Sequence, residues 1–159
     1  MASDFHLEIS EIRGESQVGR ATGSIEVLEW TIGATGTVDL STQAPNGRNR
    51  MTELTILKVV DLATPALYQC LMENVLLPNL KLIGQKAAAN NKKIEYMRIE
   101  LYNARFRAVT TKLEKEMGMI PVETVAIVYQ GIDISYTAQG EDSARRQTTF
   151  FSYEFALEL

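Results

Sequence analysis

Alternating apolar and polar residues, the pattern of a β-strand, run through most of the chain. The clearest example is the segment 151–159, where one face carries polar or small residues and the other carries only large apolar ones: Phe151, Tyr153, Phe155, Leu157 and Leu159. This alternation predicts a C-terminal strand with one buried face.

In several other segments the apolar residues change from one strand face to the other. Ile25 and Val27 give way to Leu28, Trp30 and Ile32, and similar changes occur within 54–59, 94–101 and 122–136. Such a change marks a β-bulge or a strand buried on both faces. The sequence therefore predicts a mainly β fold, a β-barrel of two packed antiparallel sheets, with one flanking α-helix and a long extended loop.

The segment between Thr64 and Pro78 breaks the alternation and predicts the helix. Thr64 is expected to cap its N-terminus, Pro65 suits the first helical position, and Pro78 is expected to end it. Helical spacing places the following side chains in one apolar stripe: Leu67, Tyr68, Leu71, Met72 and Val75. Cys70 lies beside this stripe, so we expect a packed and unreactive thiol.

Residues 33–50 form the longest predicted connection. Val38 and Leu40 alternate before a predicted turn at Pro45-Asn46-Gly47, which indicates an extended arm or hairpin. Connections longer than about 12–15 residues are usually functional or disordered, and the alternation argues against disorder. Residues 112–120 and 138–147 are predicted to be hairpin tips.

Composition narrows the classes of protein. The chain has 159 residues, 45% of them hydrophobic, which is enough for one domain spanning 1–159 with its own core. Its net charge of −4 argues against nucleic acid and anionic lipid as partners. No apolar run reaches the roughly 18 residues of a membrane helix, and MASDFHLEIS lacks the features of a secretory leader.

The chemistry available to the chain is limited, because it has one histidine, His6, and one cysteine, Cys70. A zinc site of His and Cys ligands cannot assemble within one chain, and Ser–His or Cys–His catalysis has a single possible base. His6 alternates with Phe5 and Leu7, so we expect an exposed strand histidine. Gly14–Gly19 lacks the Lys and Ser/Thr of a phosphate loop. We therefore expect no catalytic residue, no metal and no cofactor.

Two functional classes remain open at this point. One is a module that binds copies of itself, in which arginines at loop tips meet acidic neighbours or solvent: Arg48, Arg50, Arg145 and Arg146. The other is a monomeric β-barrel enzyme or ligand-binding protein with acidic residues at a barrel mouth.

Several short motifs occur in a fixed order along the chain: Gly14-Glu15-Ser16, Ile25-x-Val27-x-x-Trp30, Lys58-x-x-Asp61 followed by Thr64-Pro65-x-Leu67, and Ile94-Glu95-Tyr96. Together they resemble the haemolysin co-regulated protein (Hcp) family of type VI secretion systems. Segments 94–101 and 123–136 are similar to later strands of that family, so the resemblance covers nearly the whole chain. A histidine often found before the Ile25 strand is absent.

The resemblance implies a barrel that assembles as a homo-hexameric ring with a central hole. Rings would stack into the inner tube that a contractile sheath drives outward, in contact with spike and baseplate proteins, and the hole would hold small effector proteins. It also implies a bacterial cytoplasmic location before firing and release without a cleaved leader. A phage-like tail tube shares this architecture.

Two groups of residues receive roles from this resemblance. The arm is expected to contact the neighbouring ring through Val38, Leu40, Asn46, Arg48 and Arg50. Glu29 and Thr31 flank Trp30 on the strand that lines the hole in similar proteins. The face change at Val27–Leu28 leaves a second possibility, that both side chains lie on the outer wall.

Overall fold

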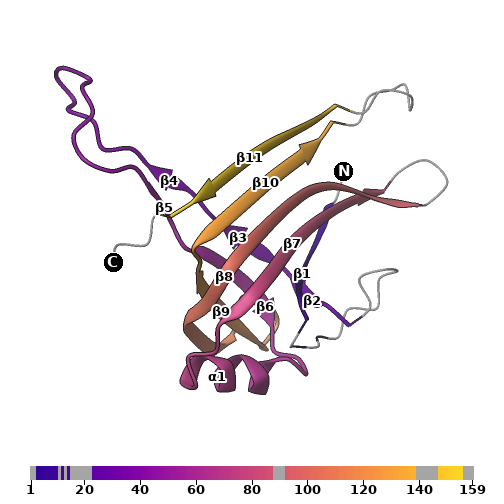
Figure 1. The fold of residues 1–159 in the computed structure, drawn as a ribbon. Helices are drawn as coiled ribbons and strands as arrows, with labels where there is room; N and C mark the ends of the chain where they lie inside the picture. The colour runs from indigo at the N-terminus through magenta and orange to yellow at the C-terminus, as the bar shows by residue number, and fades with distance from the viewer. Residues whose placement is uncertain are drawn as a thin grey trace.

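The computed structural model describes residues 3–10, 12, 14, 23–87, 92–138 and 147–155. These residues form antiparallel strands and one helix, as Figure 1 shows. In chain order the elements are β1 (Ser3–Ile9), β2 (Ile25–Val27), β3 (Glu29–Thr31), β4 (Ala34–Thr35), β5 (Arg50–Met51), β6 (Leu54–Val59), α1 (Thr64–Met72), β7 (Leu77–Ala87), β8 (Lys93–Glu114), β9 (Ile120–Val128), β10 (Gly131–Thr137) and β11 (Thr148–Glu154).

Two antiparallel sheets share the long strand β8. Its first half belongs to sheet A, which has the order β2-β1-β7-β8-β10-β11, and its second half belongs to sheet B, which has the order β8-β9-β6-β3. The chain also passes between the sheets at Leu28, whose N–H donates to the Leu57 carbonyl at 2.8 Å. The predicted mainly β class with one helix is confirmed, but the ladder does not close between β2 and β3, so the barrel is open.

The predicted changes of face within 94–101 and 25–32 have two structural causes, whereas β6 keeps one buried face through 54–59 without a register shift. In β8 the register shifts opposite Gly84 and Gln85, which leaves Tyr96 as a bulge, and it shifts again at Arg107. Between Val27 and Trp30 the change falls at the corner where the chain leaves sheet A for sheet B. Bulges and corners therefore bend the strands around one core.

The helix forms where predicted, but both predicted ends are wrong. Ala63 is the N-cap and Thr64 is the first helical residue, because the Thr64 hydroxyl is engaged in a buried polar cluster instead. The helix ends at Met72, because Asn74 adopts the left-handed conformation (φ 52°). The backbone N–H groups of the two residues Asn74 and Val75 then donate to carbonyls of the last helical turn. Pro78 lies in β7 and does not end the helix.

The core fills the space between the two sheets and under α1. Of the predicted helical stripe, Leu67 is buried, while Leu71, Val75 and the Cys70 thiol pack against the core and Met72 is exposed. Fully buried side chains come from both sheets: Leu7, Ile25, Leu54, Ile56, Leu80, Leu82, Ile99, Leu101, Val125 and Ile127. Both sheets and the helix thus share one apolar cluster.

The prediction that His6 is exposed is wrong. Its strand β1 is central in sheet A, so Glu26 on β2 and Ile83 on β7 flank His6 on either side. The ring is buried, and Nε2 lies 3.5 Å from Glu8 Oε1. Burial lowers the pKa of His6 below its ordinary value, and the nearby Glu8 carboxylate opposes part of this effect.

Candidate functional site

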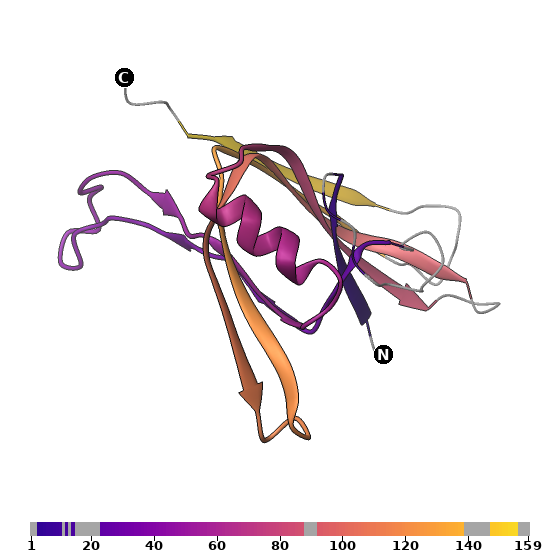
Figure 2. The same cartoon turned by 90° about the horizontal axis from the view of Figure 1, so that it is seen from below.

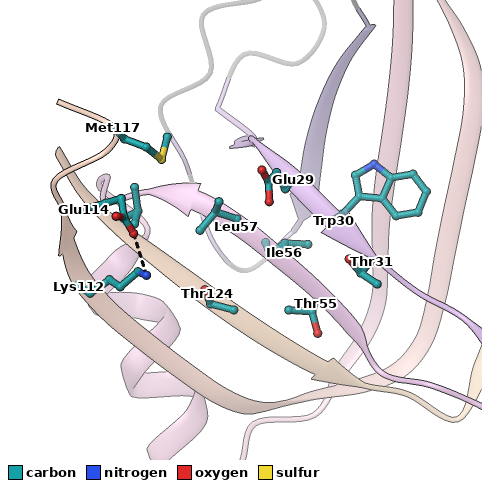
Figure 3. A pocket seen from close by; sticks show the side chains of 11 residues that line it. Glu29, Trp30, Thr31, Thr55, Ile56, Leu57, Lys112, Glu114, Met117 and Thr124 are labelled. Atoms are coloured by element: carbon teal, nitrogen blue, oxygen red, sulfur yellow. Dashed lines mark ion pairs between the residues drawn. The ribbon is translucent and has the colours of Figure 1, made fainter. Parts of the chain in front are cut away.

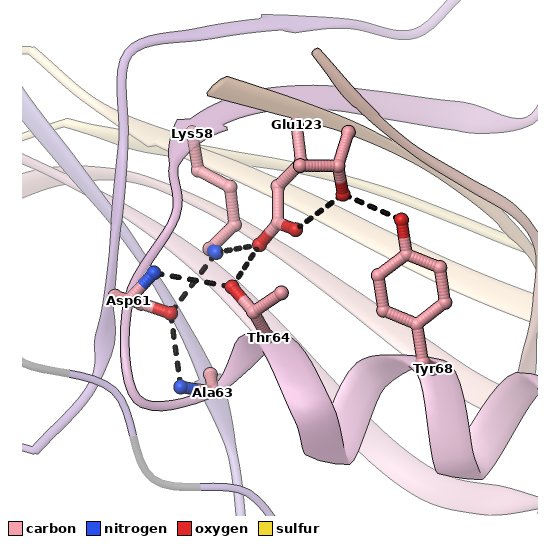
Figure 4. Close-up of polar contacts among 7 residues, drawn as sticks. Lys58, Asp61, Ala63, Thr64, Tyr68 and Glu123 are labelled. Carbon is pink, nitrogen blue, oxygen red and sulfur yellow. Dashed lines mark hydrogen bonds and ion pairs between the residues drawn. The ribbon is translucent and has the colours of Figure 1, made fainter. Parts of the chain in front are cut away.

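A buried ionic cluster joins α1 to sheet B (Figure 4). Lys58 continues the inward face of β6 after Leu54 and Ile56, so its ammonium group is carried into the interior. There Lys58 Nζ contacts the fully buried Glu123 carboxylate of β9 and lies 3.0 Å from Asp61 Oδ1. The sequence did not predict the ion pair between Lys58 and Glu123. Lys58 and Asp61 do belong to the motif Lys58-x-x-Asp61 of the family resemblance.

Hydroxyl groups complete the cluster. Thr64 Oγ1 donates to Glu123 Oε1 at 2.7 Å, and Thr111 Oγ1 donates to the other carboxylate oxygen at 3.3 Å. The Tyr68 hydroxyl bonds to Thr111, which ties the middle of the helix to β8. Every charged group in the cluster therefore has a partner, and the arrangement fixes α1 on the sheet rather than presenting a reactive group.

An uncovered apolar surface lies on β11. By register, Phe151 and Tyr153 pair with the core strand residues Ile134 and Ile132 and share their face. Among the described elements no second layer covers them: Phe151 is 46% and Tyr153 42% exposed, and Phe150 on the other face is 78% exposed. The prediction of a half-buried C-terminal strand is therefore wrong for the single chain, and Leu157 and Leu159 lie outside the described residues.

Aromatic rings continue this surface from β11 to the base of the arm. The ring centroids are 6.5 Å apart for Phe151–Tyr153, 5.3 Å for Tyr153–Phe155 and 5.7 Å for Phe155–Tyr129. The Tyr129 hydroxyl donates to the Thr52 carbonyl at 2.6 Å, and burial raises the pKa of Tyr129 to about 12. The row is exposed at Phe151 and Tyr153 and half-buried at Phe155 and Tyr129. Clustered exposed aromatic rings are typical of interaction surfaces.

The predicted arm is a hairpin that projects from the body of the molecule (Figures 1 and 2). β4 pairs with β5 at its base, and Val38 forms a bridge with Pro45. The chain reverses within 39–44, not at Pro45-Asn46-Gly47 as predicted, because the Asp39 carboxylate accepts hydrogen bonds from the backbone N–H groups of Ser41 and Thr42. The hydrogen bond from the Ser41 hydroxyl, at 2.6 Å, together with these backbone bonds lowers the pKa of Asp39.

The structure brings the predicted arm residues together on this hairpin. Leu40 at its tip is 95% exposed, and the other four are also exposed: Val38, Asn46, Arg48 and Arg50. The arm is held at its base by the hydrogen bond from Gly33 N–H to Thr52 Oγ1 at 2.7 Å and by the ion pair between Arg107 and Glu53. Arg145 and Arg146 lie outside the described residues.

Glu29 and Thr31 lie together on the outer face of sheet B, apart from the arm tip. Trp30 between them packs against the core, so the two flanking side chains point away from it. They line an open pocket of about 280 Å³ with residues of β6, β8, β9 and the turn between β8 and β9 (Figure 3). That turn, within 115–119, confirms the predicted hairpin tip.

Two absences hold for the residues that the structure describes. No group of three or more His, Cys, Asp and Glu side chains converges there in a way that could hold a metal ion. None of the helices in this part of the chain has the length and apolar character to cross a membrane.

The chain matches the family model described as "Type VI secretion system effector, Hcp" over residues 6–136. No curated protein matches it by sequence. Similar solved structures include Hcp1 from Salmonella typhimurium (TM-score 0.77, 24% identity, 98% of this chain and 96% of that chain). The secreted protein Hcp3 from Pseudomonas aeruginosa is also similar (TM-score 0.65, 15% identity, 98% and 99%). At these identities the structural likeness shows the fold.

Proposed function

The chain belongs to the Hcp family of type VI secretion system proteins, and from this premise we propose that it is a structural subunit of the inner tube. Copies join into hexameric rings, and the rings stack. The role is assembly and transport, without catalysis. The observation that supports it most directly is the aromatic face of β11, which a single chain leaves in water.

The sheet edges support a head-to-tail interface between copies. β11 pairs only with β10, and β3 pairs only with β6, so each leaves one row of backbone groups without a strand partner within the described residues. Exposed strand edges invite pairing with another chain. Because the two edges belong to different sheets, contact between unlike surfaces is favoured, and such contacts close into rings when the rotation fits.

The particle mass and shape test ring formation. Static light scattering and negative-stain imaging are expected to report a ring, whereas a compact monomer would have a radius of gyration of about 15 Å. The variant Phe151→Ser with Tyr153→Ser should shift the protein to monomers, because it removes apolar area from the interface. Met72→Ser, which changes an exposed residue of α1, is the matched control. A parent protein that stays monomeric at every concentration would refute the proposal.

The arm serves the stacking of rings in this proposal. Leu40 and Val38 offer apolar contacts to the neighbouring ring, and Arg48 and Arg50 offer charged ones. Deleting residues 38–48 leaves the base of the arm, so the subunit should fold and still form rings but no longer form tubes. Tubes from this variant, seen by negative stain, would rule out the stacking role.

The outer face of sheet B lines the central hole in this proposal, with Glu29 and Thr31 on its wall. Small effector proteins pass through or are held there, and the sheath and the spike or baseplate proteins contact other surfaces of the tube. The protein is cytoplasmic in a bacterium before firing and leaves the cell with the tube. Effector capture by Thr31→Gln, compared with the parent, tests the position of this wall, and unchanged capture would contradict it.

A further inference from the structure

The pocket on sheet B has the size of a site for one side chain. Its volume of about 280 Å³ lies just below the roughly 300–1,000 Å³ typical of sites for small-molecule ligands. It is open to solvent on the face away from the core, between β3 and the β8–β9 turn (Figure 3). An extended peptide lying across this face could therefore place a single side chain in it.

The charges of the pocket leave one carboxylate available. Lys112 Nζ lies 2.8 Å from Glu114 Oε2, and this hydrogen bond lowers the pKa of Glu114. Glu29, on the other side of the pocket in Figure 3, forms no ion pair with any residue that the structure describes. The three ionisable side chains of the lining thus carry a net charge of −1, which favours a cation as occupant.

The remaining walls suit an aliphatic stem. Leu57 contributes apolar surface between the two charged sides, Met117 adds apolar surface beside Glu114, and the Thr55 and Thr124 side chains add hydroxyl groups. Lysine and arginine combine a long aliphatic stem with a cationic head, so the stem fits the apolar walls and the head fits the carboxylate of Glu29. An acidic side chain would face Glu29 without a free cation among the described lining residues.

We propose that this pocket receives one lysine or arginine side chain of a cargo protein, with its stem against Leu57 and Met117 and its head on Glu29. The inference rests on the proposed function, in which this face lines the hole, and it adds the chemistry of the cargo. Extended basic segments are selected over acidic ones. In a hexameric ring the six pockets would bind a segment with several basic residues more tightly than one pocket binds one residue.

A methyl-labelled NMR titration tests the pocket directly. The probes are the blocked tripeptides acetyl-Gly-Lys-Gly-amide and acetyl-Gly-Glu-Gly-amide, and the signals are the methyl groups of Met117 and Leu57. We expect the lysine peptide to shift both signals and the glutamate peptide to shift neither. Binding should weaken as salt is raised, because the contact is electrostatic and exposed.

Glu29→Gln is expected to weaken binding of the lysine peptide by about threefold to tenfold, as for loss of one charge-assisted hydrogen bond near the surface. Glu26→Gln removes an exposed glutamate of β2 outside the pocket and should leave the affinity unchanged. Equal affinity for both peptides, or unchanged binding by Glu29→Gln, would overturn the inference. Particle mass measured on the same samples reports ring formation separately, so rings that bind no peptide would refute this inference alone.

Discussion

Replacing Lys58 by methionine removes the cation of the buried ionic cluster while keeping a side chain of similar length. Lys58 and Glu123 are both fully buried, so the variant leaves the Glu123 carboxylate in the interior without its ion-pair partner. Removing one member of a buried pair costs about 3–5 kcal/mol of unfolding free energy. Because Thr64 and Thr111 still donate to this carboxylate, we expect a loss of about 3 kcal/mol.

The double variant Lys58→Met with Glu123→Leu separates the cost of a lone charge from the value of the pair. It should lie within about 2 kcal/mol of the parent, because apolar replacement of a buried pair is often neutral or stabilising. Urea unfolding at one fixed protomer concentration measures these differences, since assembly adds stability by mass action.

Arg107→Met is the control, because it breaks the exposed pair with Glu53 and should cost less than about 1 kcal/mol. The reasoning is refuted if Lys58→Met loses no more than this control, or if the double variant is less stable than Lys58→Met alone.

Two other predictions concern His6 and Asn74. Burial lowers the pKa of His6 from 6.5, so the unfolded chain binds more protons than the folded one below that pH, and stability should fall as the pH drops from about 7 to 5. Urea unfolding across this range should show a smaller fall for His6→Gln, and equal falls would contradict the assignment. Asn74→Val should lose about 1–2 kcal/mol, whereas Asn74→Gly should match or exceed the parent, because φ is 52°. Thermal unfolding decides this, and equal losses for both variants would show that the backbone conformation is not the cause.

Several features of the fold could be predicted from local sequence patterns. The period-two alternation predicted within 151–159 overlaps β11 (Thr148–Glu154), and helical spacing and Pro65 place α1. The changes of face within 25–32 and 94–101 coincide with a corner at Leu28 and a bulge at Tyr96. These succeed because the geometry of a strand or helix fixes which neighbouring side chains share a face. The order of the short motifs along the chain indicated the family.

The burial of particular faces was decided by tertiary structure. Periodicity shows that His6 and Phe151 lie on defined faces, but not whether another layer covers those faces. His6 is buried on β1, which has a strand on either side, whereas Phe151 is exposed on the edge strand β11, over which no described element packs. The alternation in this segment predicts a buried apolar face, and a partner chain that covers β11 would bury it.

The ionic cluster and the pocket also required the tertiary structure. Lys58 and Glu123 are 65 residues apart, and they meet only because β6 and β9 pair in one register. Glu29 and Met117 likewise come from segments far apart in the chain. Local patterns predicted where most strands and the helix lie, because these elements depend on residues close together along the chain, and the order of the short motifs indicated the family. Which charges are buried in pairs and which remain open to a partner was decided by strand order and register.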